Sequence, residues 1–134
     1  RKITISFYNI SPNSDSQVGF RVRLKYGATV KTSGYDGVVG YTNSSNGGGN
    51  NDKTDGFYIW CNMSSERTSG HMKLTNIGNN RWVMDANGSF APTYLTQAGG
   101  YVDLGDSNEL TGLFMSYGGG ADLDSGYINV FYEV

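Results

Sequence analysis

Apolar and polar residues alternate with a period of two along most of this chain, and no window shows the 3.6-residue period of an amphipathic helix. Residues 3–8 show the alternation first. It is clearest at residues 18–25, where the apolar positions are Val18, Phe20, Val22 and Leu24. A strand that is apolar on one side only is typical of an antiparallel sheet with one solvated face. The pattern therefore predicts an all-β protein.

Turn signals divide the rest of the chain into further short strands. Gly27 turns the chain towards residues 29–32, and we predict further strands at residues 38–41, 57–63, 70–77, 81–85, 90–95, 101–104 and 109–117. With the strands at both chain ends the total is about eight to ten, which is typical of an antiparallel two-sheet sandwich or barrel. The length of 134 residues suits a single domain over residues 1–134.

Four segments between or within these strands carry more specific signals. Gly78-Asn79-Asn80 predicts one hairpin, and Asn87-Gly88, a type I′ turn signal, predicts a second. Pro92 predicts an edge strand or a bulge. Residues 43–55 contain no apolar residue and are predicted to form a long mobile loop, and residues 118–126 a second glycine-rich loop.

The last strand, residues 126–134, is apolar on both faces and carries little charge. A free edge of that kind invites aggregation, so we expect this strand in the middle of a sheet, paired with the first strand of the chain. We predict that Ile128, Val130 and Tyr132 face the core. Tyr127 and Phe131 would then face a neighbouring subunit, which predicts that copies of this chain associate.

Composition and charge narrow the possible partners. Only 16% of residues are charged and the net charge is −2, which gives no electrostatic footprint for nucleic acid or an anionic membrane. No apolar run has the length of a membrane span. Arg21, Arg23 and Lys25 share one strand face, which we interpret as solvated or ion-paired.

The single cysteine, Cys61, is expected to be a buried thiol. Because the chain begins at Arg1, directly with a strand, we interpret it as an excised fragment or a processed product.

Catalytic and metal-binding patterns are weak. His71 is the only histidine, and we expect it at the surface or in an interface. Neither a nucleophile elbow nor a phosphate-binding loop is present. The carboxylate pairs Asp103 with Asp106 and Asp122 with Asp124 leave calcium binding and glycoside hydrolysis as minor alternatives. We therefore expect neither an enzyme nor a metal or cofactor site.

Carbohydrate recognition fits the residues better. Aromatic rings stack on the C–H faces of sugars, while Asn, Asp and backbone amides bind their hydroxyls. Tyr35 and Tyr41 before the first glycine-rich segment, and Tyr117, Asp122 and Asp124 around the second, have this chemistry. The alternative is that these tyrosines fill the sandwich or an intersubunit contact, because tyrosine suits half-buried strands.

Three stretches carry a resemblance to a known group of proteins: residues 5–11 (ISFYNIS), 18–24 (VGFRVRL) and 126–134 (GYINVFYEV). In these the chain resembles phage virion domains of the jelly-roll type, found in tail fibres, tailspike tips and capsid decoration proteins. The resemblance implies a jelly-roll homotrimer on the virion surface, the C-terminal tip of a longer fibre, that binds a host surface glycan. A capsid decoration protein that contacts the capsid lattice and a carbohydrate-binding module of non-viral origin are the alternatives.

Overall fold

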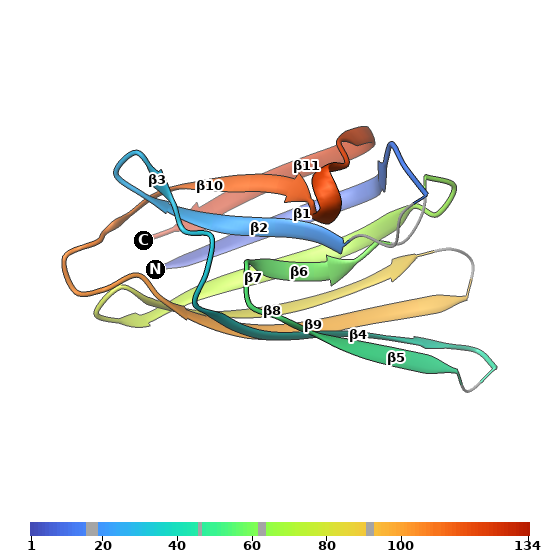
Figure 1. The fold of residues 1–134 in the computed structure, drawn as a ribbon, viewed down its shortest axis with the longest axis horizontal. Helices are drawn as coiled ribbons and strands as arrows, with labels where there is room; N and C mark the ends of the chain where they lie inside the picture. The colour runs from blue at the N-terminus through green and yellow to red at the C-terminus, as the bar shows by residue number, and fades with distance from the viewer. Residues whose placement is uncertain (16–18, 46, 62–63, 91–92) are drawn as a thin grey trace.

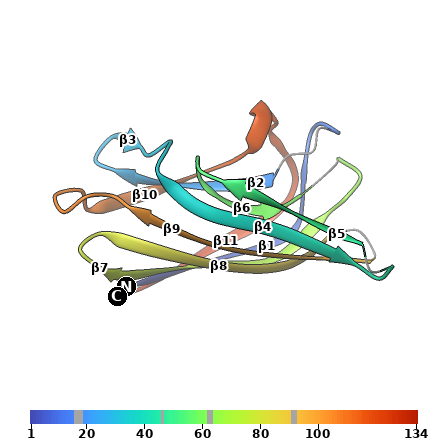
Figure 2. The ribbon, with the colours of Figure 1, turned by 60° about the horizontal axis from the view of Figure 1, so that its bottom comes forward.

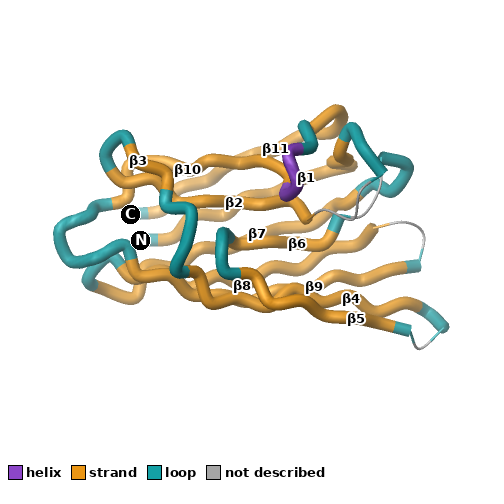
Figure 3. The backbone as a smooth tube through the Cα atoms, viewed as in Figure 1, coloured by secondary structure: helices purple, strands orange, loops and turns teal. Residues whose placement is uncertain are grey.

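The computed structural model of the chain describes residues 1–15, 19–45, 47–61, 64–90 and 93–134. Over these residues the protein is all-β, with eleven strands arranged as two layers (Figure 1, Figure 3). The strands are β1 (Lys2–Pro12), β2 (Gly19–Tyr26), β3 (Thr29–Val30), β4 (Tyr35–Asn43), β5 (Gly48–Lys53), β6 (Phe57–Trp60), β7 (Thr68–Gly78), β8 (Arg81–Phe90), β9 (Tyr94–Asp103), β10 (Leu110–Tyr117) and β11 (Leu123–Glu133), with one 3-10 turn, η1 (Gly118–Gly120). Within the described part of the chain, no helix is long and apolar enough to cross a membrane.

The strands form two antiparallel sheets. The larger has seven strands in the order β11-β1-β7-β8-β9-β4-β5, and the smaller has four, with β10, β3 and β6 all paired to β2. Figure 2 shows the smaller sheet lying over one face of the larger. This arrangement confirms the prediction of an all-β protein with two antiparallel sheets. The finer assignment to a jelly roll stays a prediction.

The core lies between the two sheets and is built by the alternation seen in the sequence. Every second residue points inward from Ile3 to Phe7 on β1 and from Phe20 to Leu24 on β2, and Ile5, Phe20 and Leu24 are fully buried. Phe7 and Phe20 join the two layers, with ring centroids 5.7 Å apart. Each such side chain contributes roughly 1.5–3 kcal/mol by burial. Val18, the first apolar position predicted for β2, lies outside the described residues.

The last strand corrects one prediction and confirms another. β11 is an edge strand with β1 as its neighbour, so the expected place in the middle of a sheet is wrong. The two chain ends do pair as predicted, with Ile5 opposite Val130. Of the three side chains expected in the core, Ile128 packs against it, whereas Val130 and Tyr132 are 48% and 55% exposed. Their exposure arises because the smaller sheet ends at β10 and leaves this side of β11 open.

The segment predicted as a long mobile loop contains a strand. β5 pairs with β4 in regular register, from Gly37 opposite Lys53 to Thr42 opposite Gly48. Asn43 closes the connection, because its side-chain oxygen accepts hydrogen bonds from the backbone N–H groups of Ser45 (3.1 Å) and Gly47 (2.7 Å). An exposed edge strand needs backbone partners rather than an apolar face, so the absence of apolar residues did not exclude a strand here.

The turn with positive φ at both central residues lies at Asn79-Asn80 and not at Asn87-Gly88, where the type I′ turn was predicted. Asn79 and Asn80 both have positive φ, 49° and 57°, and connect β7 to β8, which confirms the hairpin predicted at residues 78–80. Asn87-Gly88 instead continues β8, with Gly88 opposite Gly70 on β7. An added Cβ at Gly70 would overlap the carbonyl of Asn87, so the two backbones approach closely there. Pro92, predicted to mark an edge or bulge, lies outside the described residues.

Candidate ligand-binding groove

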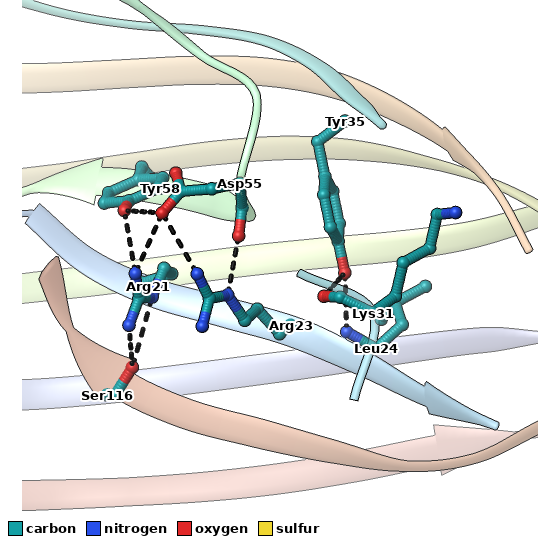
Figure 4. Close-up of polar contacts among 8 residues, drawn as sticks. All are labelled: Arg21, Arg23, Leu24, Lys31, Tyr35, Asp55, Tyr58 and Ser116. Atoms are coloured by element: carbon teal, nitrogen blue, oxygen red, sulfur yellow. Dashed lines mark hydrogen bonds and ion pairs between the residues drawn. The ribbon is translucent and has the colours of Figure 1, made fainter. Parts of the chain in front are cut away.

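Two of the tyrosines predicted to bind a ligand belong to the core. Tyr35 and Tyr117 are each 1% exposed. The Tyr35 hydroxyl accepts a hydrogen bond from the N–H of Leu24 (2.9 Å) and donates one to the carbonyl of Lys31 (3.2 Å), as Figure 4 shows. Burial raises the pKa of this hydroxyl. Side chains enclosed in this way are not available to a ligand at the surface.

Tyr117 closes the other end of the core together with the single cysteine. Its ring meets Phe20 edge-on at 5.9 Å, and its hydroxyl lies 3.6 Å from the sulfur of Cys61. Cys61 is fully buried, as predicted, and burial raises the pKa of its thiol. Tyr117 and Cys61 therefore pack the interior, and the alternative that tyrosines fill the sandwich holds for Tyr35 and Tyr117.

The remaining predicted residues are exposed or half-buried but do not come together. Tyr41 packs in an aromatic cluster with Trp60 (4.8 Å), Tyr94 (5.9 Å) and Phe90 (6.2 Å). Asp122 and Asp124 lie at the start of β11, and four strands separate β11 from β4, which carries Tyr41. The five residues therefore do not form one site.

Asp122 and Asp124 both hold the start of β11 against the end of β1. The Asn13 N–H donates to the backbone carbonyl of Asp122 (2.9 Å), and the Asp122 N–H donates to the side chain of Asn13 (3.0 Å). The carboxylate of Asp124 accepts a hydrogen bond from the Ser11 hydroxyl at 2.7 Å. Among the described residues no group of three or more His, Cys, Asp or Glu is placed to hold a metal ion.

A groove of about 760 Å³ lies on the outer face of the seven-stranded sheet, over β5, β4, β9 and β8. The side chains that point into it come from alternate positions of these strands, on the face turned away from the core: Val38, Thr42, Asn50, Asp85, Asn87, Leu95 and Gln97. Gly40 and Gly99 lie between them on the central strands, where the lack of a side chain keeps the floor low. Tyr41 is the one predicted ligand residue among the residues that line this groove.

The register of the sheet turns these positions into a continuous polar row. Asn50 lies opposite Gly40, Gly40 opposite Gln97, and Gln97 opposite Asn87. The row continues beyond the groove, from Asn87 to His71, from His71 to Ser6 and from Ser6 to Asn129 on β11. It therefore crosses all seven strands of the sheet.

The groove offers neutral hydrogen-bonding groups next to two apolar side chains. Each amide of Asn50, Asn87 and Gln97 has one accepting oxygen and two N–H donors. Val38 and Leu95 are 50% and 60% exposed and supply apolar contact surface. Lys73 lies directly opposite Asp85 on β7 and places a positive charge on the same face of the sheet. This chemistry suits an uncharged ligand that carries many hydroxyls.

The arginines of β2 form an ion-paired cluster rather than a solvated face (Figure 4). One carboxylate oxygen of Asp55 accepts hydrogen bonds from Arg21 (2.9 Å), Arg23 (3.1 Å) and Tyr58 (3.0 Å). Partial burial would raise the pKa of Asp55, but the hydrogen bonds from Tyr58 and Arg21 and the two positive charges outweigh it, so the pKa lies below its usual value. The cluster fastens the segment before β6 to β2, and its donors are engaged within the protein.

Comparison of the chain with protein-family models, with curated proteins and with solved structures finds no match. The groove and its chemistry are therefore the basis for a functional proposal.

Sequence reasoning missed most residues of this groove for two identifiable reasons. Asn50 was assigned to a mobile loop, and Asn87 to a turn, so neither was placed on a sheet face. Leu95 and Gln97 on β9 carried no clear signal either, because the apolar Leu95 is exposed and the polar Thr96 beside it is buried. What the sequence lacked was the strand order that brings β5, β4, β9 and β8 side by side.

Proposed function

We propose that this chain is a non-catalytic attachment domain that binds a surface glycan in the groove over β5, β4, β9 and β8. The observation that carries the proposal is the amide row of Asn50, Gln97 and Asn87, held in register across neighbouring strands. The volume of about 760 Å³ falls within the range of roughly 300–1,000 Å³ typical of ligand sites.

Sugar chemistry matches the groove in three respects. A sugar hydroxyl both donates and accepts hydrogen bonds, and an amide does the same, so neighbouring amides can bind successive hydroxyls of one ring. The C–H face of a sugar is apolar and fits Val38 and Leu95. A groove open along the sheet also admits an internal segment of a polysaccharide, whereas a closed pocket accepts chain ends.

The place of this activity on a virion is proposed from the resemblance of residues 5–11, 18–24 and 126–134 to phage jelly-roll domains. In that setting the chain is the receptor-binding tip of a fibre or spike, and the glycan belongs to the host surface. The jelly-roll assignment that this resemblance implies stays a prediction. The homotrimer that it also implies and a dimer paired through β11 exclude each other, and the mass of the protein in solution decides between them.

The test is binding to an immobilised panel of bacterial cell-surface polysaccharides and oligosaccharides, followed by substitution of two groove residues and of one matched control residue. Asn50 lines the groove, whereas its neighbour Asn51 points to the opposite face of β5. We expect Asn50→Ala and Asn87→Ala each to weaken binding roughly two- to twelvefold, which corresponds to one lost hydrogen bond of about 0.5–1.5 kcal/mol. Asn51→Ala should bind as the wild type does.

Three results would contradict the proposal. If the wild-type protein bound no glycan on the panel, glycan recognition would be wrong. If it bound but Asn50→Ala and Asn87→Ala had no effect, the groove would not be the site. If it released shorter products from a bound polysaccharide, the non-catalytic assignment would be wrong.

A further inference from the structure

The outer edge of β11 is unusually apolar for a free sheet edge. Tyr127 is 73% exposed, Phe131 60% and Tyr132 55%, so both faces of the strand present large side chains to solvent. Residues 125–132 include no charged side chain. Charged residues, prolines and bulges are the usual means by which sheet edges avoid pairing with other chains, and this stretch has none of the first two.

The opposite edge of the same sheet has the reverse character. β5 has the sequence GGNNDK, with no apolar side chain, and five of its six residues are exposed. An edge of this composition gives an added strand hydrogen bonds but no side-chain burial, and its two charges oppose pairing. Of the two edges of the seven-stranded sheet, β11 is therefore the one suited to association.

We propose that β11 pairs antiparallel with β11 of a second copy of this chain across a twofold axis. The two seven-stranded sheets then join into one. A twofold axis perpendicular to a sheet places the same edge strand of two copies side by side in antiparallel orientation, so the contact is self-complementary and closes as a dimer. The polar β5 edges end the joined sheet on both sides.

The side chains favour one register for this pairing. Paired residues must share a face of the sheet, so the two residue numbers of a pair differ by an even number. A register centred on Asn129 places Tyr127 opposite Phe131 of the second copy on the outer face. It places Ile128 opposite Val130 of the second copy on the inner face. Aromatic and aliphatic cross-strand pairs are among the stabilising ones in antiparallel sheets.

The open side of the core supports the same partner. A small cleft of about 250 Å³, lined by residues that include Ile3, Trp82, Leu113 and Tyr132, lies where β10 and β11 end their sheets without pairing to each other. Trp82 lines this cleft, and its indole nitrogen is buried with no hydrogen-bond partner among the described residues. The twofold axis brings the two open sides together on the inner face, where Val130 and Tyr132 of both copies cover the gap.

The exposed surface is large enough for a modest dimer. Aromatic side chains present roughly 150–250 Å² each, so Tyr127, Phe131 and Tyr132 at their exposed fractions account for about 280–470 Å² per copy. A standard interface buries about 800 Å² per partner. Val130 and Val134, which are 48% and 99% exposed, and the backbone of β11 add to the aromatic share.

The dimer has a consequence for binding, which rests on the proposed function. A twofold axis perpendicular to the joined sheet keeps both outer faces on the same side, so the two grooves face the same surface. Two weak glycan sites held in this way gain avidity on a polysaccharide layer without any new contact.

The oligomeric state of the protein in solution tests the pairing directly. Light scattering should give twice the chain mass of 14.5 kDa. The double variant Tyr127→Lys/Phe131→Lys places lysine opposite lysine at both outer pairs, and should give the monomer mass. Tyr127→Glu/Phe131→Lys places glutamate opposite lysine and should restore the dimer. Ile77→Lys, at a residue of similar exposure (57%) on β7, is the control and should remain dimeric.

A cross-link provides a second measurement that does not depend on charge. Asn129→Cys lies on the twofold axis and should form a covalent dimer on mild oxidation, whereas Asn51→Cys on the β5 edge should not. A monomeric or trimeric wild-type protein would overturn the proposal, as would a Lys/Lys variant that is folded by circular dichroism and still dimeric. Glycan binding by a monomer would refute the dimer alone, and a dimer that binds no glycan would refute the proposed function alone.

Discussion

The carboxylate of Asp55 offers the sharpest test of how this fold is held together, through the substitution Asp55→Ala. Three hydrogen bonds to one oxygen disappear, from Arg21, Arg23 and Tyr58. The side chains of Arg21 and Arg23 are only 14% and 16% exposed, so both guanidinium groups lose their carboxylate partner in a mostly buried setting. The bond from Arg23 to the backbone carbonyl of Asp55 (2.6 Å) survives the change.

The expected loss follows from the exposure of the cluster. Hydrogen bonds to charged groups contribute about 1.5–3 kcal/mol when buried, whereas exposed ion pairs contribute about 0–1 kcal/mol. The Asp55 side chain is 40% exposed, so solvent screening reduces each contact toward the lower range. We expect the free energy of unfolding to fall by about 2 kcal/mol. For 134 residues this lowers the melting temperature by about 7 °C.

The pH dependence separates the charge of Asp55 from its packing. The pKa of Asp55 is lower in the folded state than in the unfolded state. The stability that the Asp55 charge contributes is therefore fully present above the unfolded pKa of about 4, and it is lost as the pH falls through the folded pKa. Urea unfolding of the wild type and of Asp55→Ala should therefore differ most at pH 7 and converge below about pH 4. The control is Asp36→Ala, at an exposed carboxylate outside the cluster. A difference that stays constant down to pH 3, or one under 0.5 kcal/mol at pH 7, would refute this account.

Two further predictions concern the interior. Gly70→Ala inserts a methyl group where β7 approaches Asn87 and Gly88 closely, and should lower the free energy of unfolding by about 1–3 kcal/mol. The control is Gly112→Ala, whose methyl group would meet only Lys25 and should change the free energy of unfolding little. Equal stabilities of the two variants in urea would disprove the close approach. Cys61 is buried and the pKa of its thiol is raised, so a thiol reagent at pH 8 should react with it only after denaturant unfolds the protein. Fast labelling of the folded protein would contradict the burial of Cys61.

The sequence was sufficient for those elements whose side chains alternate against a core. β1 and β2 were predicted correctly because Ile3, Ile5 and Phe20 carry the period of a half-buried strand. β5 was missed because an edge strand is held by backbone hydrogen bonds, which leave no apolar period. The Asn87-Gly88 dipeptide misled for a similar reason. Its turn preference is local, and pairing with β7 and β9 on both sides outweighs it.

The candidate site was harder to predict than the fold because its residues are joined only by register. Asn50, Gln97 and Asn87 are far apart in the sequence and meet because Gly40 and the turns of the sheet align their strands. Tyr35 and Tyr117 have side chains suited to sugar binding. Residue type does not reveal whether such a ring faces the core, and here both do.

The two edges of the seven-stranded sheet explain why one small domain can hold both proposed activities. The groove lies towards β5, where polar side chains keep the surface hydrated and unpaired, and the apolar surface is concentrated at β11. Four strand spacings of about 4.8 Å separate β9 from β11, so about 19 Å lies between the middle of the groove and the proposed pairing edge. Side chains at that distance with no shared partners act independently. The proposed recognition surface and the proposed pairing edge therefore do not interfere with each other on the one sheet, and the proposed pairing at β11 leaves both grooves open.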